Sequence, residues 1–171
     1  PKRGRSRAGP RTAGRSGLGT RISSLEKAGE VLTLWEERGH EFDAVDLAAA
    51  LHRMAKLRDG KAAASSSRMA SLLQAVQERA PNFQAQAIAN TAWAMAKLGL
   101  DNRPLWDVIS AAAVAKISTF KPQGITNTAW ACATLGISDP TAMRTPRAAT
   151  PKKTSEPNAQ DAANTAWALG T

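Results

Sequence analysis

The amino-acid sequence predicts an all-α fold, an α-solenoid of helix-turn-helix repeats. The segment Asn90–Ala94 reads Asn-Thr-Ala-Trp-Ala, and it returns unchanged at 127–131 and 164–168, each copy 37 residues after the one before. A fixed period of this length is typical of stacked helical repeats. Around each copy, apolar residues recur at spacings of three and four, which indicates amphipathic helices. The chain is therefore analysed unit by unit.

The first predicted unit spans residues 23–60 and is a diverged copy. Its first helix runs from Ser23 to about Gly39, and its second from about Asp43 to Leu57. With an offset of 41 residues, the segment Met54–Leu57 aligns with Met95–Leu98, so the second helix follows the repeat pattern. His52 then stands where the later copies have Trp93.

The second and third predicted units span residues 61–100 and 101–137. A small-residue linker at 60–67 accounts for the extra residues before the second unit. Pro81 and Asn82 separate its two helices, and Pro104 and Pro122 suit helix starts in the third unit. The predicted helices run over about 67–80, 84–98, 105–117 and 123–135.

A partial, degenerate fourth unit spans residues 138–171. Pro140, Pro146, Pro151 and Pro157 interrupt the stretch where its first helix would lie. We expect a loop over about 138–157 and a short helix from Asn158 to Leu169, which contains the third copy of the repeated segment.

Residues 1–22 are expected to form a disordered basic tail, because they are rich in Arg, Gly, Ser and Pro and contain no acid. Seven cations precede Glu26, so the tail supplies +7 of the formal charge of +9 and leaves about +2 on the body. Three interpretations stay open for the tail. It reads as an organelle transit peptide, as an RNA-contacting tail, or as a solvated segment without a role.

The third unit resembles a known repeat family. Phe120–Gly136, with Pro-Gln, Asn-Thr-Ala-Trp-Ala and a closing Leu-Gly, is similar to the second helix of an octotricopeptide repeat, and Pro104–Ile109 resembles the opening of its first helix. The resemblance covers about residues 66–137 well, 24–58 loosely and 157–169 as half a unit. It extends to the leucine-rich helical region of FAST-kinase-like proteins.

The resemblance implies an α-solenoid that binds single-stranded RNA in mitochondria or chloroplasts, in RNA processing, mRNA stability or translation. Proteins of these families often carry a C-terminal RAP domain. No such domain is visible in this sequence, so no nuclease activity is carried over.

One regularity points to nucleic acid independently of the family. Cations recur at the ends of the first helices at offsets of 41, 37 and 37, namely Arg38, Arg79, Lys116 and Lys153. In a stacked array they would form a ladder in which each cation neutralises a phosphate. A cation in the last turn of a helix also complements the helix dipole without any ligand. The sequence leaves both interpretations open.

The second helices carry a repeat signature that we interpret as structural. It consists of Asn90, Trp93, Asn127, Trp130, Asn164 and Trp167. Asn followed by Thr is unfavourable inside a helix, so its recurrence predicts a tertiary partner. We favour amide bonds to a neighbouring unit over base recognition, and Trp packing between units over base stacking. Candidates for base contacts on the first helices are Ser71, Gln74, Asp107 and Ser110.

The sequence contains no catalytic constellation, and we expect a non-enzymatic protein without cofactor, metal or small-molecule substrate. His40 and His52 lack partners at metal-ligand spacing, and Cys132, the only cysteine, occupies a core position. No apolar run approaches the length of a membrane span. The alternative to RNA binding is a helical-repeat scaffold for protein partners, which the low charge of the body favours.

Overall fold

The computed structural model describes residues 15–137, and within this range every regular element is helical. The predicted loop at 138–157, the predicted helix from Asn158 to Leu169, and Lys153, Asn164 and Trp167 lie outside the described residues. The elements in chain order are α1 (Arg15–Ser24), α2 (Ala28–Arg38), η1 (Gly39–Glu41), α3 (Ala44–Lys56), α4 (Gly60–Ala64), α5 (Met69–Arg79), η2 (Ala80–Asn82), α6 (Ala85–Leu98), α7 (Arg103–Ala115), η3 (Ile117–Thr119) and α8 (Pro122–Thr134). The three η elements are single 3₁₀ turns.

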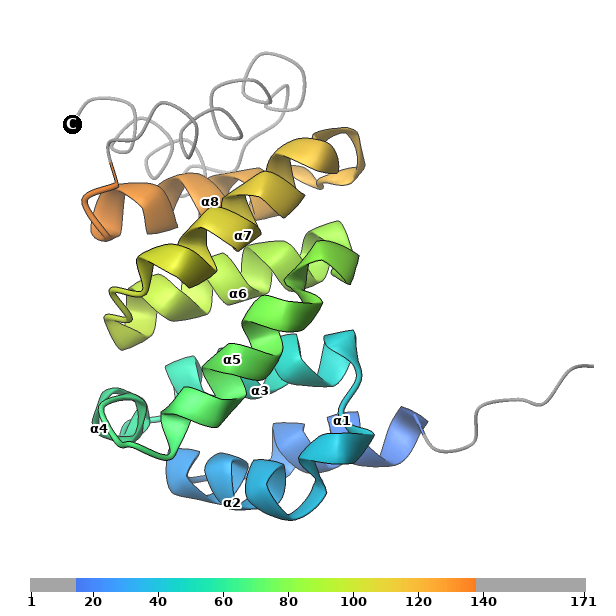
Figure 1. The fold of residues 1–171 in the computed structure, drawn as a ribbon, viewed down its shortest axis with the longest axis vertical. Helices are drawn as coiled ribbons and strands as arrows, with labels where there is room; N and C mark the ends of the chain where they lie inside the picture. The colour runs from blue at the N-terminus through green and yellow to red at the C-terminus, as the bar shows by residue number, and fades with distance from the viewer. Residues whose placement is uncertain (1–14, 138–171) are drawn as a thin grey trace, which may run out of the picture.

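The helices form two adjoining rows (Figure 1). In one row α6 packs between α3 and α8, and in the other α5 packs between α2 and α7. The rows are joined because α5 contacts α3 and α7 contacts α6. The helix that precedes each 3₁₀ turn thus lies in one row, and the helix that follows it lies in the other.

Each of the three 3₁₀ turns is followed by a phenylalanine that is buried in the core. Phe42, Phe83 and Phe120 each follow one of the three 3₁₀ turns, and each is at most 1% exposed. Their backbone N–H groups donate to the carbonyl three residues earlier, which closes the turn in the same way each time. Burial of such an aromatic side chain stabilises a fold by roughly 1.5–3 kcal/mol. The same anchor therefore connects the helices of all three units.

The second helices of the later units also end alike. Gly99 and Gly136 have φ values of 71° and 62°, a left-handed conformation that glycine adopts without steric cost. Leu100 N–H donates to the Met95 carbonyl at 2.9 Å, and Ile137 N–H donates to the Cys132 carbonyl at 3.0 Å. The repeated Leu-Gly pair of the sequence is thus a helix-terminating signal.

The expectation of disorder over residues 1–22 is wrong for residues 15–22, which belong to α1. Leu18 and Ile22, four residues apart, lie on one face of this helix and are buried, and α1 packs against α3. Ser, Arg and Gly make up most of the helix, but these two apolar residues provide a face that the α3 surface covers. Residues 1–14 lie outside the described residues.

The six helices predicted between residues 23 and 135 are all present, but α2 begins at Ala28 rather than at Ser23. The backbone N–H of Ala28 donates to both carboxylate oxygens of Asp59, at 3.0 and 2.9 Å. The Glu30 side chain accepts from the Lys27 N–H at 3.1 Å. These carboxylates satisfy the first free N–H groups of the helix, and therefore fix its start.

The predicted linker at 60–67 contains a short helix, α4. Gly60 opens it in close contact with the end of α3, because a Cβ placed at Gly60 would lie 2.1 Å from the Met54 carbonyl oxygen. α4 contacts α2, α3 and α6, so this segment belongs to the packed body.

Candidate nucleic-acid interface

Two of the predicted ladder cations make the same connection between successive units. The guanidinium of Arg79, at the end of α5, donates through Nη1 to the carbonyl of Phe42, which follows η1. Lys116, directly after α7, donates through Nζ to the carbonyl of Pro81 in η2, at 2.6 Å. Each cation therefore reaches back to the turn of the preceding unit. We refer to Arg79 and Lys116 as the clamp cations.

The partners of the clamp cations are neutral carbonyls, so the positive charges are not cancelled. Among residues 15–137, no ion pair joins either cation to a carboxylate. Guanidinium has five donors and ammonium has three, so each clamp cation keeps donors for an anion. The helix-dipole interpretation and the phosphate interpretation both remain compatible with this geometry.

Arg38, the first predicted member of the ladder, has different contacts. Its Nε and Nη2 donate to the two carboxylate oxygens of Glu41, at 2.7 and 2.6 Å. This bidentate pair lowers the pKa of Glu41 and raises that of Arg38, mainly through the hydrogen bonds. The contacts of Arg38 are thus with Glu41 of its own unit and not with a turn carbonyl of another unit. Lys153 lies outside the described residues, so the ladder comprises two clamp cations here.

Each clamp cation lines a groove between a 3₁₀ turn and the next helix of its row. The first, which we call the α2–α5 groove, has a volume of about 560 Å³. The second, the η2–α7 groove, has a volume of about 450 Å³. The α2–α5 groove is lined by Trp35, Glu36, Gly39, His40, Ser71 and Arg79, and the η2–α7 groove by Pro81, Asp107, Val108, Ala111, Ala112, Ala115 and Lys116.

The two grooves correspond to each other under the repeat alignment. Ser71 and Arg79 become Val108 and Lys116 with an offset of 37, and His40 becomes Pro81 with the offset of 41 between the first two units. Three lining positions thus recur in the two grooves along the row of α2, α5 and α7. The other lining residues of the η2–α7 groove have no counterpart in the lining of the first groove, namely Asp107, Ala111, Ala112 and Ala115. The linings differ, because the first groove has polar and aromatic walls and the second is mainly aliphatic.

Trp35 is the aromatic wall of the α2–α5 groove, and sequence reasoning did not select it. Its indole is half-buried, packs edge-on against Phe42 at a ring-centroid distance of 5.4 Å, and donates through Nε1 to the Ser71 hydroxyl at 3.0 Å. A Cβ added at Gly39 would lie 2.7 Å from the indole, so only glycine permits this close approach. One repeat later the same pair is Val76 and Ala80. This joint change from Trp-Gly to Val-Ala between the two units was the sequence signal that could have identified Trp35 as a candidate.

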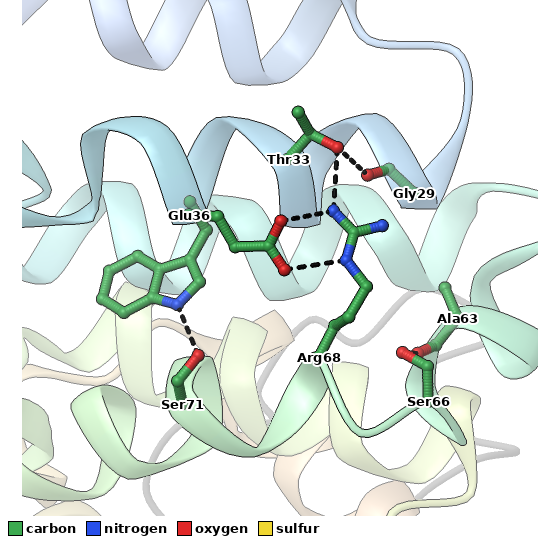
Figure 2. Close-up of polar contacts among 8 residues, drawn as sticks. Gly29, Thr33, Glu36, Ala63, Ser66, Arg68 and Ser71 are labelled. Carbon is green, nitrogen blue, oxygen red and sulfur yellow. Dashed lines mark hydrogen bonds and ion pairs between the residues drawn. The ribbon is translucent and has the colours of Figure 1, made fainter.

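A polar cluster around Glu36 compensates the negative charge of this carboxylate, which lines the groove (Figure 2). Arg68 donates through Nε and Nη2 to the two carboxylate oxygens of Glu36, both at 2.7 Å, and through Nη2 to the Thr33 hydroxyl at 2.8 Å. Thr33 in turn donates to the Gly29 carbonyl at 3.1 Å. The bonds from Arg68 lower the pKa of Glu36, which therefore stays ionised and paired.

The four predicted base-contact positions do not form one site. Ser71 is exposed in the α2–α5 groove, and Asp107 is exposed at the η2–α7 groove. Gln74 is exposed and donates to Glu78 at 3.0 Å. Ser110 is only 6% exposed and donates to the Asp107 carbonyl within its own helix, so it presents no open surface.

The repeat signature lies on the second helices, α6 and α8. Trp93 and Trp130 are both half-buried and packed against the core, and the Trp93 ring lies 5.1 Å from that of His52, its counterpart in the first unit. Burial lowers the pKa of His52, with a smaller contribution from Lys56. Asn90 accepts a hydrogen bond from Gln86 of the same helix at 3.0 Å, and Asn127 is half-buried in α8.

The remaining candidates show no reactive chemistry. Burial raises the pKa of the Cys132 thiol to about 12, so the thiol stays protonated at neutral pH. In the part of the chain that the structure describes, no group of His, Cys, Asp and Glu is arranged to hold a metal ion. Nor does any helix between residues 15 and 137 have the length and apolar character to cross a membrane.

Neither a family model nor a curated protein matches the chain.

Proposed function

We propose that the chain is an α-solenoid of helix-turn-helix repeats, about 37 residues each, that binds single-stranded RNA along the row of α2, α5 and α7. The observation that carries this proposal is the pair of clamp cations. They recur at equivalent positions in successive grooves and have neutral carbonyl partners. An anion that repeats along its length, such as a phosphate backbone, matches this arrangement.

The charges of the two grooves differ, because the η2–α7 groove contains the carboxylate of Asp107 as well as Lys116. Glu36 is paired with Arg68, and Glu41 is paired with Arg38. The uncompensated charge in the α2–α5 groove is therefore that of Arg79.

Packed helices lie about 8–10 Å apart, and this distance sets the step between one clamp cation and the next. Other helical-repeat proteins read one base with each repeat.

The test is the salt dependence of binding to a fluorescently labelled 12-nucleotide RNA. Arg79→Gln and Lys116→Gln should each weaken binding and reduce the slope of log affinity against log salt by about 0.7, the value for one phosphate on a single strand. The matched control is Lys97→Gln, which removes the same charge from the exposed end of α6, in the other row.

Circular dichroism and thermal unfolding confirm that each variant is folded before binding is compared. Loss of a carbonyl bond from a charged donor costs stability of about 1.5–3 kcal/mol. If Lys97→Gln reduces the slope as much as Lys116→Gln does, the cations act through net charge and the grooves are not the RNA track.

A protein-interaction scaffold is the second candidate, and the η2–α7 groove favours it. Its wall is formed by Val108, Ala111, Ala112 and Ala115, which suit an apolar side chain of a bound peptide. Val108→Asp would abolish such an interaction, whereas it would weaken RNA binding only through charge. Pull-down of partners with the wild-type chain and this variant separates the two functions.

The cellular role follows from the resemblance to octotricopeptide and FAST-kinase-like repeats. It supports the proposal that the chain acts in RNA processing, mRNA stability or translation in a mitochondrion or chloroplast, without a catalytic step of its own. Microscopy of a fluorescent fusion to the whole chain tests the localisation. A cytosolic signal would contradict it.

A further inference from the structure

The α2–α5 groove contains three features that the η2–α7 groove lacks. It has an aromatic wall formed by Trp35, a hydroxyl group at Ser71 and an imidazole at His40. The corresponding residues one unit later are Val76, Val108 and Pro81, and none of their side chains offers an aromatic ring or a hydrogen-bonding group. The first groove is therefore equipped for a ligand with both a flat apolar part and a polar part.

The indole of Trp35 is held in a fixed orientation. Phe42 supports it from one side at 79° between the ring planes, the backbone at Gly39 approaches it closely, and Ser71 accepts its N–H. Because Ser71 accepts this bond, its hydroxyl hydrogen can be donated to a ligand. A fixed aromatic surface loses little conformational entropy when a base stacks on it.

The charges around the groove select an anion. Arg79 lines the same groove as Trp35, and its hydrogen-bond partner there is the Phe42 carbonyl. The one carboxylate in the lining, Glu36, is held by Arg68 in a bidentate pair on the flank of α2 (Figure 2). A ligand that carries a planar ring next to a negative group matches this combination.

We propose that the α2–α5 groove is a nucleotide pocket, in which one base of a single-stranded RNA stacks on Trp35 while Arg79 holds the adjoining phosphate. This inference rests on the proposed function and specifies it. The array then contacts the RNA backbone at both grooves but contacts a base at only one of them.

The direct test uses adenosine monophosphate as the probe and the indole N–H signals of the protein in nuclear magnetic resonance spectra. The Trp35 signal is assigned by its loss in Trp35→Phe. Adenosine monophosphate should shift this signal, whereas inorganic phosphate at the same concentration should not. Equal shifts with both probes, or none with either, would overturn the pocket.

The second test uses RNA. Trp35→Leu should weaken binding of a 12-nucleotide oligoadenylate roughly tenfold, the loss expected for one stacked base. It should leave the salt slope unchanged, because no charge is removed. An RNA of the same length with abasic sites should bind both proteins equally. A variant that loses affinity for both RNAs would show that Trp35 acts only through the fold.

A milder variant guards against misfolding. Ser71→Ala removes the acceptor that orients the indole and the hydroxyl hydrogen that a ligand could accept, and should weaken oligoadenylate binding severalfold. The matched control is Ser67→Ala, an exposed serine in the turn before α5. Unchanged binding by Trp35→Leu and Ser71→Ala, with the slope effects of the clamp cations intact, would reject the pocket but retain the proposed function. A shift by adenosine monophosphate without any slope effects would retain the pocket and reject the track.

Discussion

At the scale of single residues, the most specific feature is the contact between Trp35 and Gly39. A glycine in the turn after a helix is common, but here its role is steric, because a Cβ at this position would enter the indole ring. The contact orients Trp35 over its groove. It connects a local backbone choice directly to the surface that we propose binds a base.

Gly39→Ala should therefore destabilise the protein. The added methyl group forces the indole to move, and overpacking of this kind costs about 1–3 kcal/mol. Urea unfolding measures the change. Gly29→Ala in α2 is the control, because a Cβ there meets nothing within 4 Å and should stabilise the helix by about 0.5–1 kcal/mol. A similar gain from Gly39→Ala would refute the steric role.

Cys132 offers a pH-dependent prediction. In the unfolded chain the thiol ionises near its ordinary pKa of 9.0, whereas in the folded protein it keeps its proton until about pH 12. Between these values the unfolded state binds fewer protons, so the free energy of unfolding should fall as pH rises. Urea titrations at several pH values measure this, and Cys132→Ala should remove this component of the fall.

At the scale of elements, the repeat pattern predicted the six helices between residues 23 and 135, because a period in the sequence reports apolar faces directly. It did not predict α1, whose apolar face consists of Leu18 and Ile22 within a basic, glycine-containing stretch. Nor did it predict the start of α2, which depends on Asp59, a residue 31 positions away from Ala28. Such tertiary capping leaves no local signal.

The packing of α1 against α3 is testable through Ile22, which is fully buried. Ile22→Ala should lower the free energy of unfolding by about 2–5 kcal/mol, because it removes buried methyl groups and leaves a cavity. Ser23→Ala, on the exposed side of the same helix, should change it by less than about 0.5 kcal/mol. Equal small effects of both changes would mean that α1 contributes nothing to the core.

The candidate site was only partly predictable from sequence. Alignment of the units placed Arg79 and Lys116 at equivalent positions, since that requires only the period. It gave no sign that they would bond to the turns of the preceding unit, or that Arg38 would pair with Glu41, because both depend on side-chain geometry. Ser110 was selected by its position on the first helix, and its burial shows that the period alone does not identify the open face.

At the scale of the whole molecule, the central claim is that repetition in sequence creates repetition along a surface. Two rows of helices place the α2–α5 groove and the η2–α7 groove in succession, each with one clamp cation. A single RNA strand that follows this row would contact both cations at once. The weak overall charge of the body, about +2, is then compatible with RNA binding because the two clamp cations lie in succession along one row.

The most direct measurement is the salt dependence of RNA binding by the double variant Arg79→Gln/Lys116→Gln, compared with each single variant and with Lys97→Gln. If one strand contacts both clamp cations, the slope should fall by about 1.4, twice the fall of about 0.7 for each single variant. A double variant whose slope falls no further than that of either single variant would show that the two grooves do not form one track.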